Sequence, residues 1–181
     1  LSLGNKAHEK HPYLLSGLSI KAPNHVWCSD ITYVRLRGGF VYLVAVMDWS
    51  SRYVLSWDLS ITLDAEFCVT TLDRALSVTQ PEIFNTDQGS QYTSESFQRL
   101  LTSLGITCSM SRSGNVWDNA VMESFFSTLK IERCHRQPYH TRDDARADIF
   151  TYIERFYNPR RRHSKLGYLS PMEFEARAML A

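Results

Sequence analysis

The sequence predicts an α/β domain in which a mixed five-stranded sheet, three antiparallel strands and then two parallel ones, is flanked by helices. Two observations lead to this fold class. Three stretches rich in β-branched and aromatic residues follow one another before residue 60, separated by short polar turns. After residue 64, apolar residues at helical spacing alternate with short strand-like runs, an order typical of a sheet covered by helices.

The first three strands are expected to form an antiparallel meander. They cover Val26–Leu36, Phe40–Met47 and Tyr53–Leu59, and the breaks between them are Arg37-Gly38-Gly39 and Asp48-Trp49-Ser50-Ser51-Arg52. Short connections of this kind join neighbouring antiparallel strands. The middle strand is apolar at nearly every position, so both faces of the sheet should be covered.

Two helices and two short strands follow. The first helix begins at the N-cap Asp64 and ends before Pro81, and the second begins at the N-cap Ser94 and stops at Gly105. The strands are Glu82–Thr86 and Ile106–Met110. A strand that follows a helical crossover can pair in parallel with an earlier strand.

The remainder of the chain is predicted to be helical. The longest helix covers Asp118–Arg133, Thr141-x-x-Asp144 resembles a capping box for a helix running to about Tyr157, and Ser170-Pro171-Met172-Glu173 opens a terminal helix. These elements divide the chain into a lead-in at residues 1–20, a core at 21–135 and a C-terminal helical extension at 136–181.

The composition is that of an ordinary folded protein: 181 residues, 44% hydrophobic and 22% charged, with a net charge of +1. No apolar run approaches the ~18 residues of a membrane span, and the start lacks the apolar core of a signal peptide. The absence of an initial Met is consistent with a piece of a longer protein. The cysteines form no CxxC pair, as expected for reduced thiols in the cytoplasm, and His25-x-x-Cys28 lacks a second zinc half-site.

A basic run lies in the extension. Arg155, Arg160, Arg161, Arg162 and Lys165 occur within eleven positions together with His163, and no acid interrupts them. Two interpretations stay open from the residues alone, a solvated helix end or a patch that binds phosphate.

Three acids stand out by position, although each has an ordinary explanation. Asp30 lies inside an apolar strand, where an unpaired carboxylate costs on the order of several kcal/mol to bury, yet satisfied acids do occur in strands. Asp87 lies where a strand meets a glycine-bearing loop, which suits a ligand site or an Asx turn. Glu123 shares a polar helical stripe with Asn119, which suits a site or a solvated face.

Considered together, the three acids suggest a metal site. Hard cations such as Mg²⁺ prefer carboxylate oxygens, with waters and substrate phosphates completing the shell. Two such ions about 4 Å apart can assist an in-line displacement at phosphorus. Two strand-borne acids and one helix-borne acid could converge for that purpose, although the residues alone do not establish that they meet.

Four ordered motifs make the chain resemble the DDE transposases and retroviral-type integrases, and most of all the OrfB product of bacterial insertion sequences. The motifs are Trp27-Cys28-Ser29-Asp30-Ile31-Thr32-Tyr33, Asn85-Thr86-Asp87-Gln88-Gly89-Ser90-Gln91-Tyr92, Asp118-Asn119-Ala120-Val121-Met122-Glu123-Ser124, and a final set formed by Tyr157-Asn158, Arg162-His163-Ser164, Leu166-Gly167-Tyr168 and Ser170-Pro171. Between Asp87 and Glu123 lie 123 − 87 − 1 = 35 residues, the spacing typical of that family. The resemblance extends over nearly the whole chain.

The resemblance implies an RNase H-like fold and a catalytic core in which Asp30, Asp87 and Glu123 hold two Mg²⁺ or Mn²⁺ ions. DNA would be the substrate. Water would first cut at an element end, and the freed 3′-hydroxyl would then attack a second phosphodiester. This DNA integration, or transposition, needs no covalent protein–DNA intermediate.

The resemblance also implies DNA contacts. Lys130, seven positions beyond Glu123 on the same predicted helix, would contact the DNA end, and Ser90 and Gln91 would reach DNA from the loop after Asp87. Asn119 would support the metal site or DNA. Phosphates would be held by Arg160, Arg161, Arg162, His163 and Lys165.

Other candidates are expected to have structural roles. Asp48 should stabilise the turn between two strands, paired with Arg52, rather than bind metal. Trp49 and Trp117 are expected to pack rather than stack on bases. The remaining pair, His135 and His140, should lie on the surface.

Two alternatives to a transposase remain at this stage. One is an RNase H-like nuclease that cuts but never joins strands, and the other is a domesticated DNA-binding protein whose site is idle. The transposase hypothesis also implies partners. A homo-oligomer would hold two DNA ends together, and a helix-turn-helix region or partner chain, which is not visible in this sequence, would recognise those ends.

Overall fold

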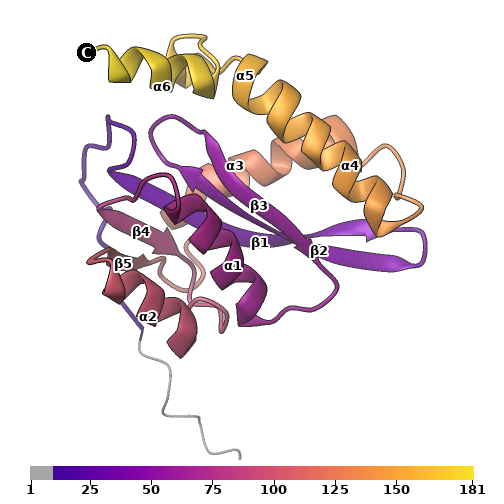
Figure 1. Cartoon of the computed structure of the whole chain (residues 1–181), viewed down its shortest axis with the longest axis horizontal. Helices are drawn as coiled ribbons and strands as arrows, with labels where there is room; N and C mark the ends of the chain where they lie inside the picture. Colours follow the sequence, from indigo (N-terminus) through magenta and orange to yellow (C-terminus); the bar gives the residue numbers. More distant parts are fainter. Residues whose placement is uncertain (1–9) are drawn as a thin grey trace, which may run out of the picture.

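A computed structural model of the protein describes residues 10–181, so residues 1–9 of the expected lead-in lie outside the described part. Five strands form one sheet in the order β3-β2-β1-β4-β5 (Figure 1). The strands are β1 Val26–Leu36, β2 Gly39–Asp48, β3 Val54–Ser60, β4 Ile83–Thr86 and β5 Thr107–Met110. Strands β1, β2 and β3 are antiparallel, and β4 and β5 continue the sheet in parallel to β1. The predicted mixed sheet is confirmed.

The helices are α1 Ala65–Leu76, α2 Glu95–Ser103, α3 Ala120–Leu129, α4 Arg142–Tyr152, α5 Asn158–Arg160 and α6 Pro171–Met179. Four helices, α1, α2, α4 and α6, begin at the capping residues that the sequence indicates. Asp64 and Ser94 accept hydrogen bonds from backbone N–H groups in the first turns of α1 and α2. Thr141 and Ser170 each form a capping box with the acid three residues later. Each such cap stabilises its helix by about 1 kcal/mol.

The helix expected over Asp118–Arg133 is wrong in its bounds. A 3₁₀ turn at Val116–Asn119 precedes α3, and a π-helical turn at Lys130–Cys134 follows it. The carboxylate of Asp118 is bonded to Arg112, and Asn119 has a non-helical backbone (φ −137°), so the regular helix starts only at Ala120. The long helix from Thr141 also ends in a π-helical turn, at Ile153–Tyr157.

Both faces of the sheet are covered, as the apolar middle strand predicts. Side chains alternate between the faces of a strand. In β2, Leu43 and Ala45 join one hydrophobic cluster with α3 and α4, whereas Val44 and Val46 join another with α1 and α2. Figure 1 shows α1 and α2 on one side of the sheet and α3 and α4 on the other.

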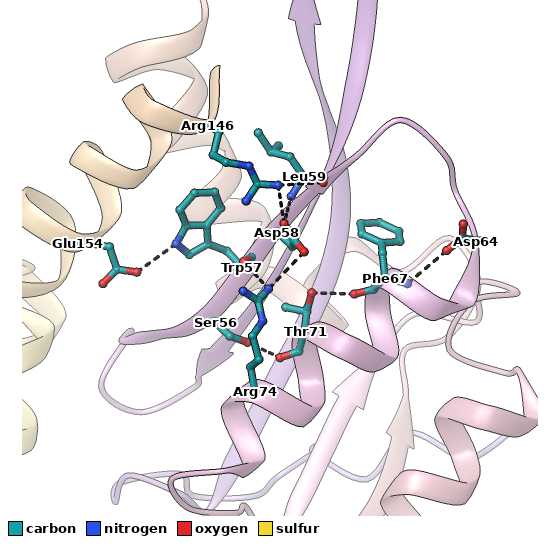
Figure 2. A network of polar contacts seen from close by, with 10 residues as sticks. All are labelled: Ser56, Trp57, Asp58, Leu59, Asp64, Phe67, Thr71, Arg74, Arg146 and Glu154. Atoms are coloured by element: carbon teal, nitrogen blue, oxygen red, sulfur yellow. Dashed lines mark hydrogen bonds and ion pairs between the residues drawn. The ribbon is translucent and has the colours of Figure 1, made fainter. Parts of the chain in front are cut away.

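Helix α4, from the C-terminal extension, packs directly on the core. Ala145, Ile149 and Tyr152 are buried in the same cluster as the sheet residues of β1, β2 and β3. Polar contacts add to this at strand β3, where Asp58 pairs with both Arg146 of α4 (2.7 Å) and Arg74 of α1 (3.4 Å) (Figure 2). The extension is therefore continuous in packing with residues 21–135.

Two further sequence expectations can be compared with the structure. The cysteines are all free and buried, as expected for reduced thiols. Within residues 10–181, none of the helices has the length and apolar character needed to cross a membrane.

Candidate metal centre

Asp30 and Asp87 lie where two parallel strands part. Pairing between β1 and β4 ends at Cys28 and Asn85, and each acid is two residues further along the chain (28 + 2 = 30; 85 + 2 = 87), Asp30 within β1 and Asp87 directly after β4. The carboxyl ends of parallel strands are where α/β sheets place ligand sites. The following loop leaves room for the acid, because a Cβ at Gly89 would lie 2.8 Å from Oδ1 of Asp87.

Glu123 is brought to the same place by two buried amides. The Nδ2 of Asn85 in β4 donates to the carbonyl of Asp118 (3.0 Å), and the Nδ2 of Asn119 donates to the carbonyl of Ser29 (3.2 Å), next to Asp30. These bonds fix the start of α3 against the ends of β1 and β4. Glu123, one turn along α3, therefore faces the gap between the two strands.

The three acids line one pocket of about 370 Å³, here called the acidic pocket. Asn119 and the loop at residues 111–116 complete its walls. Burial, followed by the negative charges of Asp87 and Glu123, raises the pKa of Asp30 to about 7. A like charge nearby raises the pKa of a carboxyl group, so the electrostatics agree with the shared pocket.

The donor atoms fit a hard cation, although the ligand shell is open. Oδ1 of Asn119 is buried in the pocket wall without a hydrogen-bond partner, and it adds a neutral oxygen to the carboxylates. However, Asp30 and Asp87 accept backbone N–H groups from Ile31 and Gly89, both at 2.8 Å. In the described part of the chain, His, Cys, Asp and Glu side chains form no group of three around a common metal position. Closing the shell requires rotation of the exposed Asp87 and Glu123.

An ion pair that the sequence reasoning missed holds the wall of the acidic pocket. Asp118 is almost fully buried and accepts from Nε (2.9 Å), Nη2 (2.8 Å) and the backbone N–H (2.8 Å) of Arg112. Hydrogen bonds from Arg112 hold the pKa of Asp118 below its usual value. The two residues are six apart and close a loop. Neither helical nor strand periodicity relates them, so the sequence pattern does not predict the ion pair.

Comparison with known proteins shows the family to which the chain belongs. The family described as integrase core domain matches residues 20–116, and a second integrase core domain family matches residues 104–171. The chain belongs to the integrase core domain family. The resemblance inferred from the sequence motifs is thereby confirmed.

Curated relatives of this integrase core are bacterial transposases. The transposase for insertion sequence element IS904 of Lactococcus lactis is 43% identical over 157 residues, which are 85% of this chain and 62% of the relative. Transposase InsF for insertion sequence IS3A of Escherichia coli is 42% identical over 156 residues, 84% of this chain and 54% of the relative. The chain thus spans between half and two thirds of the length of these relatives.

Solved structures share the fold. The simian T-cell lymphotropic virus intasome in complex with a PP2A regulatory subunit superposes with a TM-score of 0.71 at 20% identity, covering 94% of this chain and 60% of that one. The HTLV-2 integrase catalytic core domain in complex with magnesium gives a TM-score of 0.64 at 19% identity, covering 85% of this chain and 97% of that one. The RNase H-like fold expected from the motifs is confirmed.

The residues expected to contact DNA near the acids occupy different surroundings. Asn119 lines the acidic pocket, and Ser90 is exposed in the turn after Asp87. Gln91 donates to the carbonyl of Leu63 (3.1 Å). Lys130 follows α3, and its Nζ lies 5.0 Å from the centre of the exposed Tyr33 ring.

The residues of the basic run differ in their surroundings. Arg161 donates to Glu132 through Nη2 (2.8 Å) and Nε (3.1 Å). Arg160, Arg162 and Lys165 are exposed. Burial, followed by the nearby charges of Arg161 and Arg52, lowers the pKa of His163 to about 4, so its ring is neutral at pH 7.

Most of the expected structural roles are found. Asp48 caps the β2–β3 turn by accepting the N–H groups of Ser50 (2.9 Å) and Ser51 (2.8 Å), and Trp49 packs against the core. The expectation for Trp117 is wrong, because its side chain is 78% exposed at the rim of the loop. Asp48 is bonded to backbone groups, and none of the ion pairs among described residues joins it to Arg52.

The two histidines expected at the surface, His135 and His140, are exposed.

Proposed function

We propose that this integrase core is the catalytic part of a transposase, which cuts DNA and joins the freed 3′-hydroxyl to a target strand. The observation that carries the proposal is the acidic pocket, in which Asp30, Asp87 and Glu123 meet at the parting of β1 and β4. The relatives are named transposases of insertion sequences, which supports strand joining over simple hydrolysis.

Asp30, Asp87 and Glu123 are the residues that would hold two Mg²⁺ or Mn²⁺ ions, with Oδ1 of Asn119 beside them. When bound, such ions supply activation of the attacking oxygen and neutralisation of the leaving one. The protein contributes the position of the carboxylates. Because the pKa of Asp30 is raised to about 7, a proton competes with a cation for this carboxylate near neutral pH, and a cation that binds there displaces that proton.

The chain's other residues would hold the DNA. Lys130 and Ser90, with Gln91, flank the acidic pocket, and the basic run Arg160, Arg161, Arg162, His163 and Lys165 adds contacts to phosphates, which give affinity but little sequence preference. Two element ends must be brought together, so we propose a homo-oligomer in the working complex. Recognition of those ends would come from a helix-turn-helix region or a partner chain, and the protein would act at the nucleoid in the bacterial cytoplasm.

The proposal is tested by strand transfer in Mn²⁺. A labelled duplex with a pre-cut 3′-hydroxyl end and an unlabelled target duplex are incubated with the wild-type chain or with Glu123→Gln. Loss of one ligand oxygen's charge should reduce joined product by more than ~100-fold, since several kcal/mol of transition-state stabilisation depend on the metal.

The control variant is Glu66→Gln, which removes an exposed carboxylate from the first turn of α1. It should join DNA as the wild type does. Equal joining by wild type and Glu123→Gln would refute the assignment of the three acids. Cutting without joined product would instead identify a nuclease.

A further inference from the structure

A second hollow, here called the basic groove, is lined by other residues of α3. Its volume is about 640 Å³. Ser124 and Thr128 of α3 form one wall, Trp49 and Arg52 of the β2–β3 turn form another, and the segment from residue 161 to 168 closes it. Four of its lining residues are Arg or Lys, and none is acidic.

Arg52 enters this groove from a strained turn. Its φ is +63°, in the left-handed region that Gly or Asn adopts more readily. The turn is held by Asp48, whose carboxylate accepts the N–H groups of Ser50 and Ser51 and whose carbonyl accepts the N–H of Arg52 (3.0 Å). Strained backbone at a non-glycine residue is often found at binding sites, and here it directs a cation into the groove.

One nitrogen of the Arg52 guanidinium has no hydrogen-bond partner among the described residues. Its Nη1 is buried without a hydrogen bond, and none of the ion pairs among described residues includes Arg52. A buried guanidinium N–H left unpaired is costly unless an anion completes it. Nε2 of His163, which lines the same groove, is likewise buried and unpartnered.

The neighbouring basic residues differ in their availability. Arg161 also lines the groove, but Glu132 already takes its guanidinium. Arg162 and Lys165 are exposed at the rim and can add to the positive potential. Arg155 belongs to the same run and is exposed, yet it does not line the groove. The buried donors thus identify one position within a generally basic surface.

The basic groove and the acidic pocket are neighbours along α3. Asn119 and Glu123 line the acidic pocket, whereas Ala120 and Ser124, the residues that follow them, line the groove. One extended polyanion can therefore occupy both. The rings of Trp49 and Tyr168 in the groove walls offer flat apolar surfaces beside the cations, a combination typical of nucleic-acid sites.

We propose that the basic groove binds a non-reacting backbone phosphate of the DNA whose neighbouring phosphodiester lies in the acidic pocket. Arg52 is the anchoring residue, through the guanidinium that lines the groove, and His163 lines the groove beside it. This inference rests on the proposed function only in taking DNA as the polyanion.

The test measures binding of the 181-residue chain to a fluorescent 30-base-pair duplex by anisotropy, in EDTA so that no chemistry occurs. Arg52→Asn should weaken binding by ~10-fold or more and lower the slope of log K against log salt by about one. Arg155→Asn removes the same charge outside the groove and should change binding by less than ~2-fold. Equal effects of the two substitutions would overturn the proposal.

Thermal unfolding provides a second readout. Because Asn tolerates positive φ and carries no charge to bury, Arg52→Asn should unfold at the same temperature as the wild type or higher, while binding is lost. A lower Tm with unchanged binding would mean that Arg52 is only a structural residue. If Arg52→Asn does not fold, the pair Arg162→Gln and Lys165→Gln, both exposed, replaces it. This pair should weaken binding by more than Arg142→Gln and Arg155→Gln together, which remove two exposed charges outside the groove, and equal weakening would overturn the proposal.

The outcomes of these binding tests can be distinguished from the outcomes of the strand-transfer test. If Arg52→Asn binds DNA normally and Glu123→Gln still fails to join DNA, the proposed role of the groove is wrong and the proposed transposase function stands. If Arg52→Asn binds DNA more weakly but the wild type and Glu123→Gln join DNA equally, the proposed role of the groove stands and the proposed chemistry is wrong.

Discussion

Asp30 shows how a residue can oppose folding when its ligand is absent. Its pKa rises from 3.8 to about 7 because the carboxyl is buried beside Asp87 and Glu123. An acid whose pKa is higher in the folded state stabilises the fold most below the unfolded pKa and loses that contribution as pH rises through the folded pKa. Above pH 7 the ionised Asp30 therefore costs stability.

This cost predicts that Asp30→Asn stabilises the metal-free protein at alkaline pH. In EDTA, its Tm should exceed that of the wild type by several degrees at pH 8.5, since ~1 kcal/mol moves Tm by roughly 2–4 °C in a protein of this size. The difference should shrink at pH 5.5, where Asp30 is protonated in the fold. A difference that is the same at both pH values would contradict the raised pKa.

Residue types and spacing indicated Asp30, Asp87 and Glu123 from the sequence, but they predicted neither a place for Arg52 in a groove nor the Arg112–Asp118 pair. The acids sit in motifs whose flanking residues are as informative as the acids themselves. Arg52 gains its meaning only from a positive φ and from walls supplied by α3 and residues 161–168. No local pattern encodes contacts between segments so far apart.

At the scale of elements, the strands and caps could be predicted because their signals are local. β1 was expected at Val26–Leu36 and has those bounds. Helix α3 was not so well predicted, because its first residues are set by tertiary bonds. Asn85 takes the carbonyl of Asp118, and Arg112 takes its side chain, so 3₁₀ geometry replaces the helix that propensity favours.

The loop at residues 111–119 depends on the Arg112–Asp118 pair. Replacing Arg112 with Met leaves a buried carboxylate with one backbone donor, and should lower the free energy of unfolding by about 2–3 kcal/mol. Urea denaturation measures the loss. Adding Asp118→Asn should recover part of it, since a neutral amide costs less to bury. No recovery in the double variant would mean that Arg112 acts through packing alone.

At the scale of the whole molecule, the C-terminal helices complete the core. Ala145, Ile149, Tyr152, Ile153 and Tyr157 are buried in the cluster that covers one face of the sheet. Sequence patterns predicted these helices. Their basic residues indicated a role in binding DNA, and their packing against the sheet was not predicted. The face that they cover could not be assigned without the sheet in place.

A chain ending at residue 135 should therefore fail to fold cooperatively. Removing α4 exposes the cluster on β1, β2 and β3, and burial of each such large apolar side chain contributes roughly 1.5–3 kcal/mol, against a total stability of about 5–15 kcal/mol. Thermal unfolding followed by circular dichroism should show no sharp transition. A chain ending at residue 169, which loses mainly the exposed α6, should keep the transition at a lower Tm. A cooperative transition in the shorter chain would show that residues 21–135 are self-sufficient.

The central place of β1 makes the acidic pocket depend on segments that are far apart in the chain. β1 lies between β2 and β4, and its partner in β4 is 85 − 28 = 57 residues further along the chain. Glu123 lies further along still, on α3, and α4 from beyond it packs in the same cluster as α3. If the three acids form the proposed metal site, that site can exist only after all of these segments have packed together, so a partly folded chain should not bind the metal ions.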